Sequence, residues 1–346
     1  MIIENKLIGD NSPVFIIAEL SANHNGSLQN AIDSIRAAKR AGADCIKLQT
    51  YTPDTLTIDC SKDDFIIKGT VWDKQKLYEL YKQAYTPWDW HYELFRIAKE
   101  EGIIIFSSPF DKTSVDFLEQ LNTPAYKIAS FEITDIPLIE YVASKNKPII
   151  ISTGIAEIND IELALDACKR MGNQNIALLK CTSSYPAPIE EANMIMIKDY
   201  KKKFNIITGL SDHTMGSIVP IVSVCYGAKI IEKHFILDHS IGGPDASFSM
   251  NEEEFTEMVE NIRTAELAIG KITYTLTDKQ INGRNFSRSL YIIEDIKQGE
   301  IITTKNVKSI RPGFGLHPKY LSSILGKTAN KNLYRGEPFK LTDIEE

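Results

Sequence analysis

The sequence predicts an α/β protein built on a (β/α)8 TIM barrel, and three observations lead to this fold. The first 235 residues contain eight short apolar runs, with helix-like stretches between them. Each run is nearly continuous in Val, Ile and Leu, as expected for parallel strands that are buried on both faces. The alternation recurs about every 20 to 30 residues without repeated sequence, which favours an α/β fold over a solenoid.

Each of the eight expected strands ends in a polar residue. In chain order the strands read VFIIAEL, DCIKLQT, IIIFSSPF, AYKIAS, PIIIST, ALLKCTSSY, IITGLSDH and KIIEKHF. In a (β/α)8 barrel the carboxyl ends of the strands converge on one open face, where active sites lie. The polar endings therefore predict the position of a site as well as a fold.

The segments between the strands carry the expected helices. These span residues 27–43, 112–122, 139–146, 159–173, 191–204, 217–228 and 252–269. The second connection differs, because residues 51–73 have little regular pattern and precede one long helix that ends at Gly102. A long insertion on the open face is typical of a binding loop or lid. Residues 1–13 are expected to form a small strand or hairpin before the barrel.

The chain is expected to contain two domains. Residues 1–269 form the TIM-barrel catalytic domain, and the polar, Gly-containing residues 270–284 form a linker. From residue 285 to residue 346, short strands alternate with turns such as QGE and RGE. A domain of roughly 60 residues is marginally stable by itself. We therefore expect it to pack against a barrel, either its own or that of a partner.

Composition narrows the function classes. The net charge of −7 argues against nonspecific binding to nucleic acid or to anionic membranes. The first ten residues lack the basic and apolar regions of a signal peptide, and no run approaches the roughly 18 apolar residues needed to span a bilayer. The five cysteines are widely spaced and contain no CxxC pair, which predicts a reducing, cytoplasmic location and disfavours a thiolate zinc site.

Two histidines end the last two expected strands. His213 and His234 lie on neighbouring strands at matching positions, so both imidazoles could share one divalent cation. Asp212 and Glu232 are candidates for orienting the two rings from behind. The alternative is that each histidine is a hydrogen-bonded structural residue.

Two lysines occupy strands that would be buried in the barrel. A buried Lys47 or Lys127 is costly unless it meets an anion or a carboxylate. One interpretation is a phosphate and carboxylate site, with small hydroxyls nearby. The hydroxyl residues at the strand ends are Ser107, Ser108, Ser130, Ser152, Thr153, Ser183 and Ser211. The other interpretation is an internal ion pair with Glu19, Glu132 or Glu232.

Two further interpretations stay open at this point. Barrel strands also carry the lysines of Schiff-base aldolases, and Lys127 and Lys180 would be the candidates here. Two histidines arranged for a metal are superfluous to that mechanism. The C-terminal domain alone suggests a carbohydrate-binding or ice-binding protein, but ice binding needs a flat, moderately apolar face and this segment carries many charges.

The motifs of this chain closely resemble those of the bacterial sialic acid synthase family, in the same order. The matching segments, from about residue 14 to the C-terminus, are AELSANHNG, IKLQTYTPDTL, FSSPFD, YKIASFE, ISTGIA, LKCTSSYP, GLSDH, EKHF and IRPGFGLHPK. The resemblance implies a TIM barrel followed by a small antifreeze-like SAF domain of the β-clip type. It also implies a transferase that condenses phosphoenolpyruvate with an N-acetylated amino sugar to give a nine-carbon keto acid and phosphate.

The resemblance also assigns roles. It implies that His213 and His234 are the metal ligands, for Mn²⁺ or else Mg²⁺ or Co²⁺. Phosphoenolpyruvate would be held by Lys47, Ser108, Lys127, Ser130, Ser152, Ser183 and Ser211. Ser108 and Ser183 stand where sialic acid synthases tend to have Thr and Asn. Glu19, Glu132, Tyr185 and Asp245 would face the sugar, with Glu132 also orienting a water molecule. Arg311 would reach the sugar's acetamido group from the other subunit of a domain-swapped homodimer.

The segments SANHNG and RPGFGLHPK resemble the pseudaminic branch of this family. That branch uses 2,4-diacetamido-2,4,6-trideoxy-L-altrose, a more apolar sugar than N-acetylmannosamine. N-acetylmannosamine or its diacetamido analogue, the acceptors of neuraminate and legionaminate synthases, are the alternatives.

Overall fold

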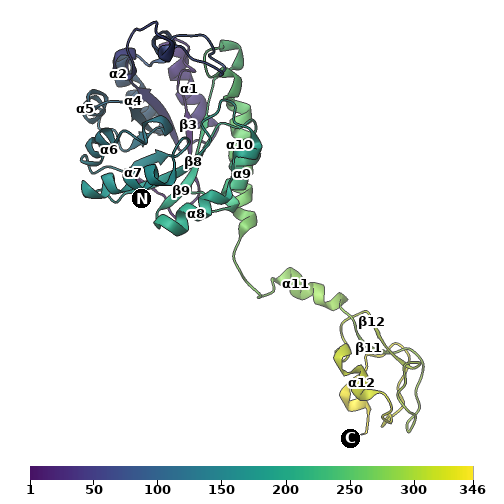
Figure 1. The fold of residues 1–346 in the computed structure, drawn as a ribbon. Coiled ribbons are helices and arrows are strands. Elements are labelled where there is room, and N and C mark those ends of the chain that lie inside the picture. The colour runs from purple at the N-terminus through teal and green to yellow at the C-terminus, as the bar shows by residue number, and fades with distance from the viewer. Residues whose placement is uncertain (346) are drawn as a thin grey trace. The chain divides into compact units, whose positions relative to one another are not determined.

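A computed structural model describes residues 1–345 of the chain. The chain divides into two compact units, Met1–Gly270 and Lys271–Glu346. The first unit is a closed barrel of eight parallel strands, in which each strand pairs with its neighbours along the chain and the last pairs with the first (Figure 1). The predicted TIM barrel is therefore confirmed. Its strands are β3 (Phe15–Glu19), β4 (Cys45–Thr50), β5 (Ile104–Pro109), β6 (Tyr126–Ile128), β7 (Ile149–Ser152), β8 (Ile176–Cys181), β9 (Ile207–Asp212) and β10 (Ile230–His234).

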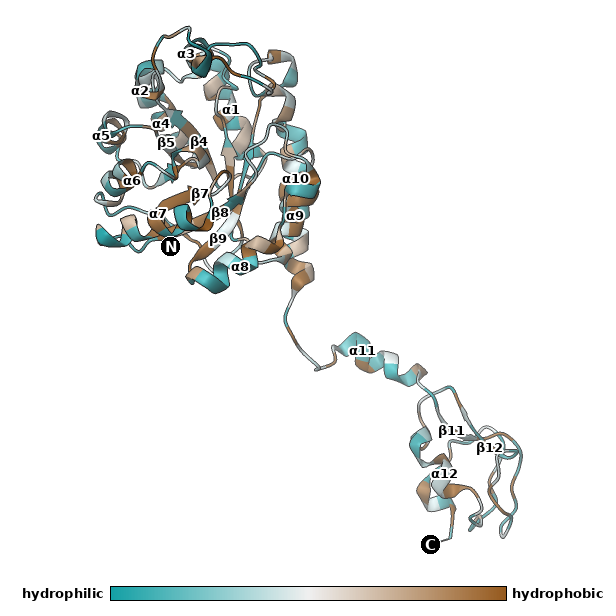
Figure 2. Ribbon diagram, viewed as in Figure 1, coloured by the Kyte–Doolittle hydropathy of each residue, from teal (hydrophilic) through white to brown (hydrophobic). Residues whose placement is uncertain are grey.

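The two faces of each strand serve different cores. Residues such as Ile17, Phe106 and Leu179 belong to one buried cluster, whereas Ile16 and Ile46 pack in a second cluster with the helices. Burial on both faces explains the near-continuous apolar runs of the sequence. Figure 2 shows strand β7 in the brown of hydrophobic residues, whereas outer helices such as α8 carry hydrophilic segments in teal.

Helices follow the strands around the barrel. They are α1 (Leu28–Arg40), α4 (Trp88–Glu101), α5 (Lys112–Gln120), α6 (Ile136–Ala143), α7 (Ile158–Arg170), α8 (Ile195–Phe204), α9 (Ile218–Cys225) and α10 (Glu252–Ile269). Local sequence sets where several of them begin. Asp111 caps α5 by accepting from two backbone N–H groups, and Asn251 forms a capping box with Glu254 at the start of α10.

The long helix expected before Gly102 is in fact two helices, so that prediction was wrong. Helix α3 (Leu77–Ala84) ends before Pro87, and α4 begins at Trp88. Proline lacks a backbone N–H and its ring clashes with the preceding turn, so it cannot lie inside a continuous helix. The segment 51–73 contains one short helix, α2 (Pro53–Leu56), a single 3-10 turn and otherwise irregular backbone.

The N-terminal hairpin closes one end of the barrel. Strands β1 (Ile2–Ile3) and β2 (Lys6–Leu7) pair in antiparallel fashion, as expected for residues 1–13. Ile3 and Ile8 are buried in the same cluster as Phe15, Cys45 and other residues that point into the barrel. These side chains fill the amino-terminal end of the barrel, opposite the polar strand ends.

The second unit has its own small core. Strands β11 (Ser289–Ile292) and β12 (Val307–Ile310) pair, and they pack with the short helix α12 (Leu321–Ile324) around a cluster that includes Leu290, Val307 and Phe339. The segment expected as a linker contains a helix, α11 (Asp278–Gly283), that begins at a Thr277 cap. Among the described residues no helix has the length and apolarity to cross a bilayer.

Candidate active site

The polar strand endings meet inside the barrel because of strand alternation. Side chains two residues apart on a strand share a face, so Glu19 follows Ile17 inward and Lys47 follows Cys45. Strand pairing then sets which endings become neighbours. Glu19 lies opposite Lys47 on one side and opposite His234 on the other.

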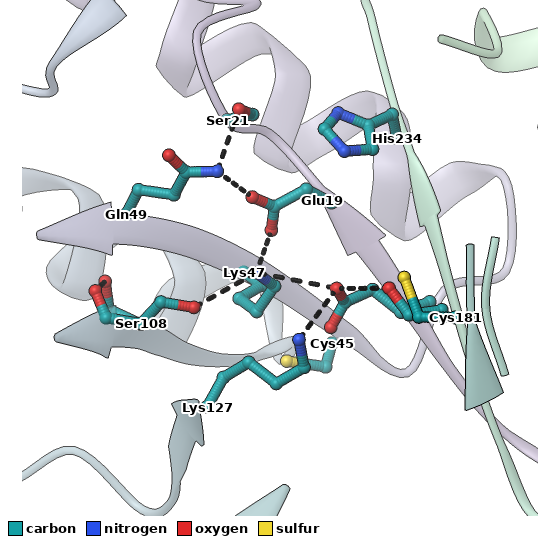
Figure 3. Close-up of polar contacts among 12 residues, drawn as sticks. Glu19, Ser21, Cys45, Lys47, Gln49, Ser108, Lys127, Cys181 and His234 are labelled. Atoms are coloured by element: carbon teal, nitrogen blue, oxygen red, sulfur yellow. Dashed lines mark hydrogen bonds and ion pairs between the residues drawn. The ribbon is translucent and has the colours of Figure 1, made fainter. Parts of the chain in front are cut away.

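Two buried lysines and two buried carboxylates form the centre of the site. Lys47 Nζ lies 2.8 Å from Glu19 Oε2 and 3.6 Å from Glu232 Oε1, while Lys127 Nζ lies 3.3 Å from Glu232 Oε1. All four side chains are almost fully buried. Figure 3 shows Lys47 between Glu19 and Ser108, with Lys127 pointing at the same cluster. The lysines predicted from the sequence thus share one site, where they pair with Glu19 and Glu232.

Burial and charge determine the protonation of this cluster. Burial raises the pKa of Glu19 to about 7, although Lys47 acts in the opposite direction. Burial would also raise the pKa of Glu232, but Lys127 and Lys47 hold that pKa below its ordinary value. Burial lowers the pKa of the Lys127 ammonium against the attraction of Glu232. Glu19 is therefore the carboxylate in this cluster that can take up a proton near neutral pH.

Gln49 fixes the position of Glu19. Its side-chain N–H group donates to Glu19 Oε1 at 2.8 Å and to Ser21 Oγ at 2.9 Å (Figure 3). Glu19 is held from one side by an amide and from the other by Lys47. Sequence reasoning did not assign Gln49 a role, although its position two residues after Lys47 places it on the same face of β4.

Small hydroxyl groups line the site next to Lys47 and Lys127. Lys47 Nζ donates to Ser108 Oγ at 3.2 Å, and Ser211 Oγ donates to Glu232 Oε1 at 3.2 Å. Ser152 Oγ is buried and has no hydrogen-bond partner. A buried hydroxyl without a partner is costly, which indicates that a ligand oxygen could satisfy it.

Two more hydroxyls converge on Gly154. The Gly154 N–H donates to Ser130 Oγ at 3.1 Å. A Cβ atom at this position would lie 2.0 Å from Ser183 Oγ and 2.8 Å from Ser130 Oγ, so the close approach of these serines requires glycine here. Ser183 Oγ also lies 3.8 Å from Cys181 Sγ.

The two imidazoles lie side by side, with ring centroids 5.3 Å apart. His213 Nδ1 donates to the Thr182 carbonyl oxygen at 3.0 Å. His234 Nδ1 is buried without a hydrogen-bond partner, and it lies 3.7 Å from Asp245 Oδ2. Burial lowers the pKa of His234 well below its ordinary value, so this ring is neutral, as a metal ligand must be.

These observations fit a divalent cation held by two imidazoles. Among the described residues no group of three or more His, Cys, Asp and Glu side chains could hold a metal ion. A cation between His213 and His234 would therefore keep positions open for water or for a substrate oxygen.

The prediction that Asp212 and Glu232 orient the two histidine rings was wrong. Asp212 Oδ2 instead pairs with Lys233 Nζ at 2.5 Å and accepts from Thr214 Oγ1 at 3.0 Å. Successive strand residues face opposite sides, so Asp212 cannot share a face with His213. Glu232 does face inward, but it contacts the two lysines and Ser211 rather than either ring.

Two further carboxyl groups have raised pKa values. Burial raises the pKa of Glu132 to about 7, and Glu132 Oε2 has no hydrogen-bond partner. Burial also raises the pKa of Asp245, whose carboxylate lies closest to His234. Glu132 can therefore hold or move a proton near neutral pH.

An aromatic layer covers the imidazoles. The Tyr185 ring lies 4.3 Å from the His213 ring, and the Phe248 ring lies 5.1 Å from the His234 ring. Trp72, from the irregular segment before α3, contacts Tyr185 with ring centroids 5.6 Å apart. Tyr185 was expected from the sequence, whereas Trp72 and Phe248 were missed because both lie in loops without a strand pattern.

Cys181 was also missed as a site residue, because a cysteine within an apolar run is typical of a small core residue. It is buried, but Sγ lies 3.7 Å from His213 Nδ1. Although burial acts to raise it, the pKa of the Cys181 thiol falls to about 7 because of His213 and neighbouring donors. Its position two residues after the inward-facing Leu179 could have indicated this.

One candidate residue, Lys180, does not point into this site. Lys180 is on the opposite face of β8 from Cys181, and Lys180 Nζ donates to the Cys181 carbonyl at 2.6 Å and to Thr182 Oγ1 at 3.1 Å. This position removes one of the two Schiff-base candidates. Arg311 belongs to the second unit, where it is exposed.

The barrel brings together the other candidate residues, which are Glu19, Lys47, Ser108, Lys127, Ser130, Glu132, Ser152, Ser183, Tyr185, Ser211, His213, His234 and Asp245.

Comparison with known proteins agrees with this fold. The NeuB family model matches residues 34–274, and the SAF domain model matches residues 287–345. The chain is 51% identical over 331 residues to a pseudaminic acid synthase from Campylobacter jejuni, covering 96% of each chain. It is 48% identical to a pseudaminic acid synthase from Helicobacter pylori, covering 96% of this chain and 98% of that protein.

A solved structure is also similar. An N-acetylneuraminic acid synthetase from Leptospira borgpetersenii, crystallised in complex with citrate, matches 82% of this chain and 96% of its own, with a TM-score of 0.73 and 30% identity.

Proposed function

Since this chain belongs to the NeuB family of sialic acid synthases, we propose that it is a pseudaminic acid synthase. It condenses phosphoenolpyruvate with 2,4-diacetamido-2,4,6-trideoxy-L-altrose and water, giving the nine-carbon keto acid pseudaminic acid and phosphate. The identity of about half with two named pseudaminic acid synthases, over nearly the whole chain, supports this acceptor. The acceptors of neuraminate and legionaminate synthases, N-acetylmannosamine and its diacetamido analogue, are the alternatives; the identity with an N-acetylneuraminic acid synthetase is lower, at 30%.

The observation that carries the proposal is the pair of buried ammonium groups, Lys47 and Lys127, in one site. Both lysines can bind a ligand with two anionic groups, because the anionic groups can replace Glu19 and Glu232 as their counter-charges. Lys127 and the hydroxyls of Ser130, Ser152 and Ser183 hold the phosphate. Lys47, with Ser108, holds the carboxylate.

His213 and His234 would hold a divalent cation, for which Mn²⁺ is our expectation and Mg²⁺ or Co²⁺ also suit two imidazoles with open positions. When bound, this ion polarises the aldehyde group of the open-chain acceptor. The orphaned Nδ1 of the neutral His234 supports this assignment.

The reaction joins carbon 3 of phosphoenolpyruvate to carbon 1 of the acceptor. The aldehyde oxygen takes a proton and becomes a hydroxyl, while carbon 2 of phosphoenolpyruvate becomes electron-poor. Water adds at this carbon, loses a proton, and the C–O bond to phosphate breaks. The two lysines fix the reacting anion in place. Glu19 and Glu132, each with a pKa of about 7, are both able to exchange the protons that these steps need.

The sugar lies against Tyr185 and Asp245, which adjoin the imidazoles. The family resemblance supports Arg311 as a further contact, to an acetamido group, from the partner subunit of a domain-swapped homodimer. The exposed position of Arg311 in its own unit is compatible with this role.

A panel of acceptors tests the proposal. Phosphate release is measured with phosphoenolpyruvate and each of three sugars: the trideoxy-altrose, N-acetylmannosamine and its 2,4-diacetamido analogue. We expect the trideoxy-altrose to give the highest kcat/KM. A preference for N-acetylmannosamine would show that the proposed acceptor is wrong, but it would leave the proposed condensation with phosphoenolpyruvate unchanged.

Two further experiments test the bound metal and the role of Lys127. Treatment with a chelator should abolish turnover, and returned Mn²⁺ should restore it; full activity in chelator would remove the metal from the proposal. Borohydride trapping of a covalent adduct on Lys127 would instead favour an aldolase.

A further inference from the structure

Trp72 connects three loops at the carboxyl end of the barrel. Its ring lies 5.6 Å from that of Tyr185 and 6.5 Å from that of Phe248, measured between centroids. Its indole N–H donates to the Pro244 carbonyl at 3.1 Å. Tyr185 follows β8, and Pro244 and Phe248 both follow β10, so a single side chain joins the segment before α3 to the loops after these two strands.

The aromatic layer made by Trp72, Tyr185 and Phe248 is continuous and reaches both imidazoles. Tyr185 lies 5.2 Å from Phe248, 4.3 Å from His213 and 6.3 Å from His234. Phe248 is buried, at 2% exposure, and lies 5.1 Å from His234. In the proposed function carbon 1 of the acceptor approaches the imidazoles, and this layer is the aromatic surface beside them.

The outer part of the layer can offer only apolar contacts. The Trp72 N–H is already used by Pro244, and Phe248 has no polar atom. Trp72 also lines a hollow of about 630 Å³, whose wall combines apolar residues such as Val71 and Leu80 with polar ones such as Asn25, Gln75, Gln83 and Ser247. This volume lies within the range that holds a small ligand.

The distal end of the proposed acceptor differs from that of common hexoses. Carbon 6 of the trideoxy sugar bears a methyl group in place of a hydroxymethyl group. A hydroxyl pressed against the Trp72 ring would lose its water without gaining a partner there, whereas a methyl group would gain from leaving water.

We propose that Trp72, supported by Phe248, is the residue that selects an acceptor deoxygenated at carbon 6. The inference rests on the proposed function, because it concerns the sugar of that same site. Trp72 contacts the distal carbon of the sugar and takes no part in bond formation.

The experiment compares two acceptors that differ in one oxygen atom: 2,4-diacetamido-2,4,6-trideoxy-L-altrose and the same sugar with a hydroxyl on carbon 6. Phosphate release gives kcat/KM for both sugars with the wild type, Trp72→Ala and Trp72→Phe. We expect Trp72→Ala to lower kcat/KM for the 6-deoxy sugar roughly tenfold to a hundredfold, and to change that for the 6-hydroxy sugar less than about threefold. Trp72→Phe keeps an apolar ring and should retain most of the selectivity.

Trp88→Phe provides the matched control. The Trp88 indole N–H also donates to a backbone carbonyl, that of Tyr51 at 3.1 Å, and its ring stacks on Phe117, which does not belong to the aromatic layer. Any loss in this variant should be equal for the two sugars. The KM for phosphoenolpyruvate should stay constant in all variants.

Three outcomes overturn the inference. If Trp72→Ala loses activity equally with both sugars, Trp72 acts as a structural or lid residue. If Trp72→Ala leaves kcat/KM unchanged for both sugars, Trp72 does not contact the sugar. If the wild type shows no preference between the pair while still using both, the selectivity itself is absent and the proposed function survives. A wild type that uses neither altrose sugar contradicts the proposed function and the inference together.

Discussion

Glu132 is a carboxyl group for which folding changes proton binding. Its pKa is raised from 4.5 to about 7 by burial, with Lys127 acting in the opposite direction, and its Oε2 atom has no partner. A group with a raised carboxyl pKa binds its proton more tightly in the folded state than in the unfolded state. Its contribution to the free energy of unfolding is therefore complete below about pH 4.5 and is lost as the pH rises to about 7.

We expect Glu132→Gln to remove this pH dependence. The amide cannot ionise, so the variant should be more stable than the wild type by about 2 kcal/mol at about pH 8 and should differ little near about pH 4.5. Thermal unfolding at both pH values measures the difference. Glu190→Gln, at an exposed position, is the control and should show no such change. A stability difference that is constant with pH would show that Glu132 does not titrate in this range.

At the residue scale, the sequence predicts which side chains enter the site and which carboxylates can pair with the lysines, but not which lysine meets which carboxylate. Glu19, Lys47 and Lys127 could be predicted because a charged residue inside an apolar run must meet a partner. That Lys47 and Lys127 share Glu232 depends on strand register and on the curvature of the closed barrel, which no local pattern specifies. The face of Asp212 could have been predicted, since it precedes an inward-facing histidine.

A buried ion pair on the outer face of the barrel joins β9 and β10, the two strands whose ends carry the histidines. Lys233 Nζ contacts Asp212 Oδ2 at 2.5 Å and also the Thr214 carbonyl, and the lysine is 1% exposed. Asp212 and Lys233 are direct partners in the β9–β10 ladder, and each precedes one of the histidines. This pair therefore ties together the ends of both strands.

We expect Lys233→Met to destabilise the barrel by about 3 kcal/mol, because it leaves the Asp212 carboxylate buried and unpaired. Urea unfolding measures the change. Arg170→Met, which breaks the exposed pair with Glu140, is the matched control and should cost less than about 1 kcal/mol. If both variants lost the same free energy of unfolding, an unpaired buried Asp212 carboxylate would cost no more than an unpaired exposed one, and the prediction would be wrong. The double variant Lys233→Met with Asp212→Leu should recover part of the loss.

At the element scale, the strands were predictable and the long connection was not. The eight strands follow from apolar runs that need burial on both faces. The break between α3 and α4 depends on Pro87, a signal present in the sequence. The position of Trp72 is different, because its contacts come from loops after β8 and β10 that are far away along the chain.

At the scale of the whole molecule, the role of Arg311 can be tested by mixing two inactive variants. Lys127→Ala removes a phosphate contact in the barrel, and Arg311→Ala removes the contact proposed to come from the partner. If Arg311 acts on the partner's barrel, a mixed dimer has one site with both residues intact. We expect mixing under exchange conditions to restore about a quarter of wild-type activity, from random pairing of subunits.

The control is Lys127→Ala mixed with Lys47→Ala, both in the barrel. Such a dimer has a defect in every site and should regain nothing. If the mixture with Arg311→Ala also stays inactive while subunits exchange, Arg311 acts within its own chain or not at all. The sequence alone could suggest this arrangement only by resemblance, because the short second domain carries no internal signal of where it packs.

The filled amino-terminal end of the barrel has a consequence for ligand exchange. Ile3 and Ile8 of the N-terminal segment pack against the inward-facing side chains, and the lysine cluster lies beyond them. In the proposed reaction, both substrates and both products would consequently pass through the opposite opening, beside Trp72 and Tyr185. An acceptor bound at that opening would obstruct the escape of the smaller anion behind it, so we expect the three-carbon compound to enter first.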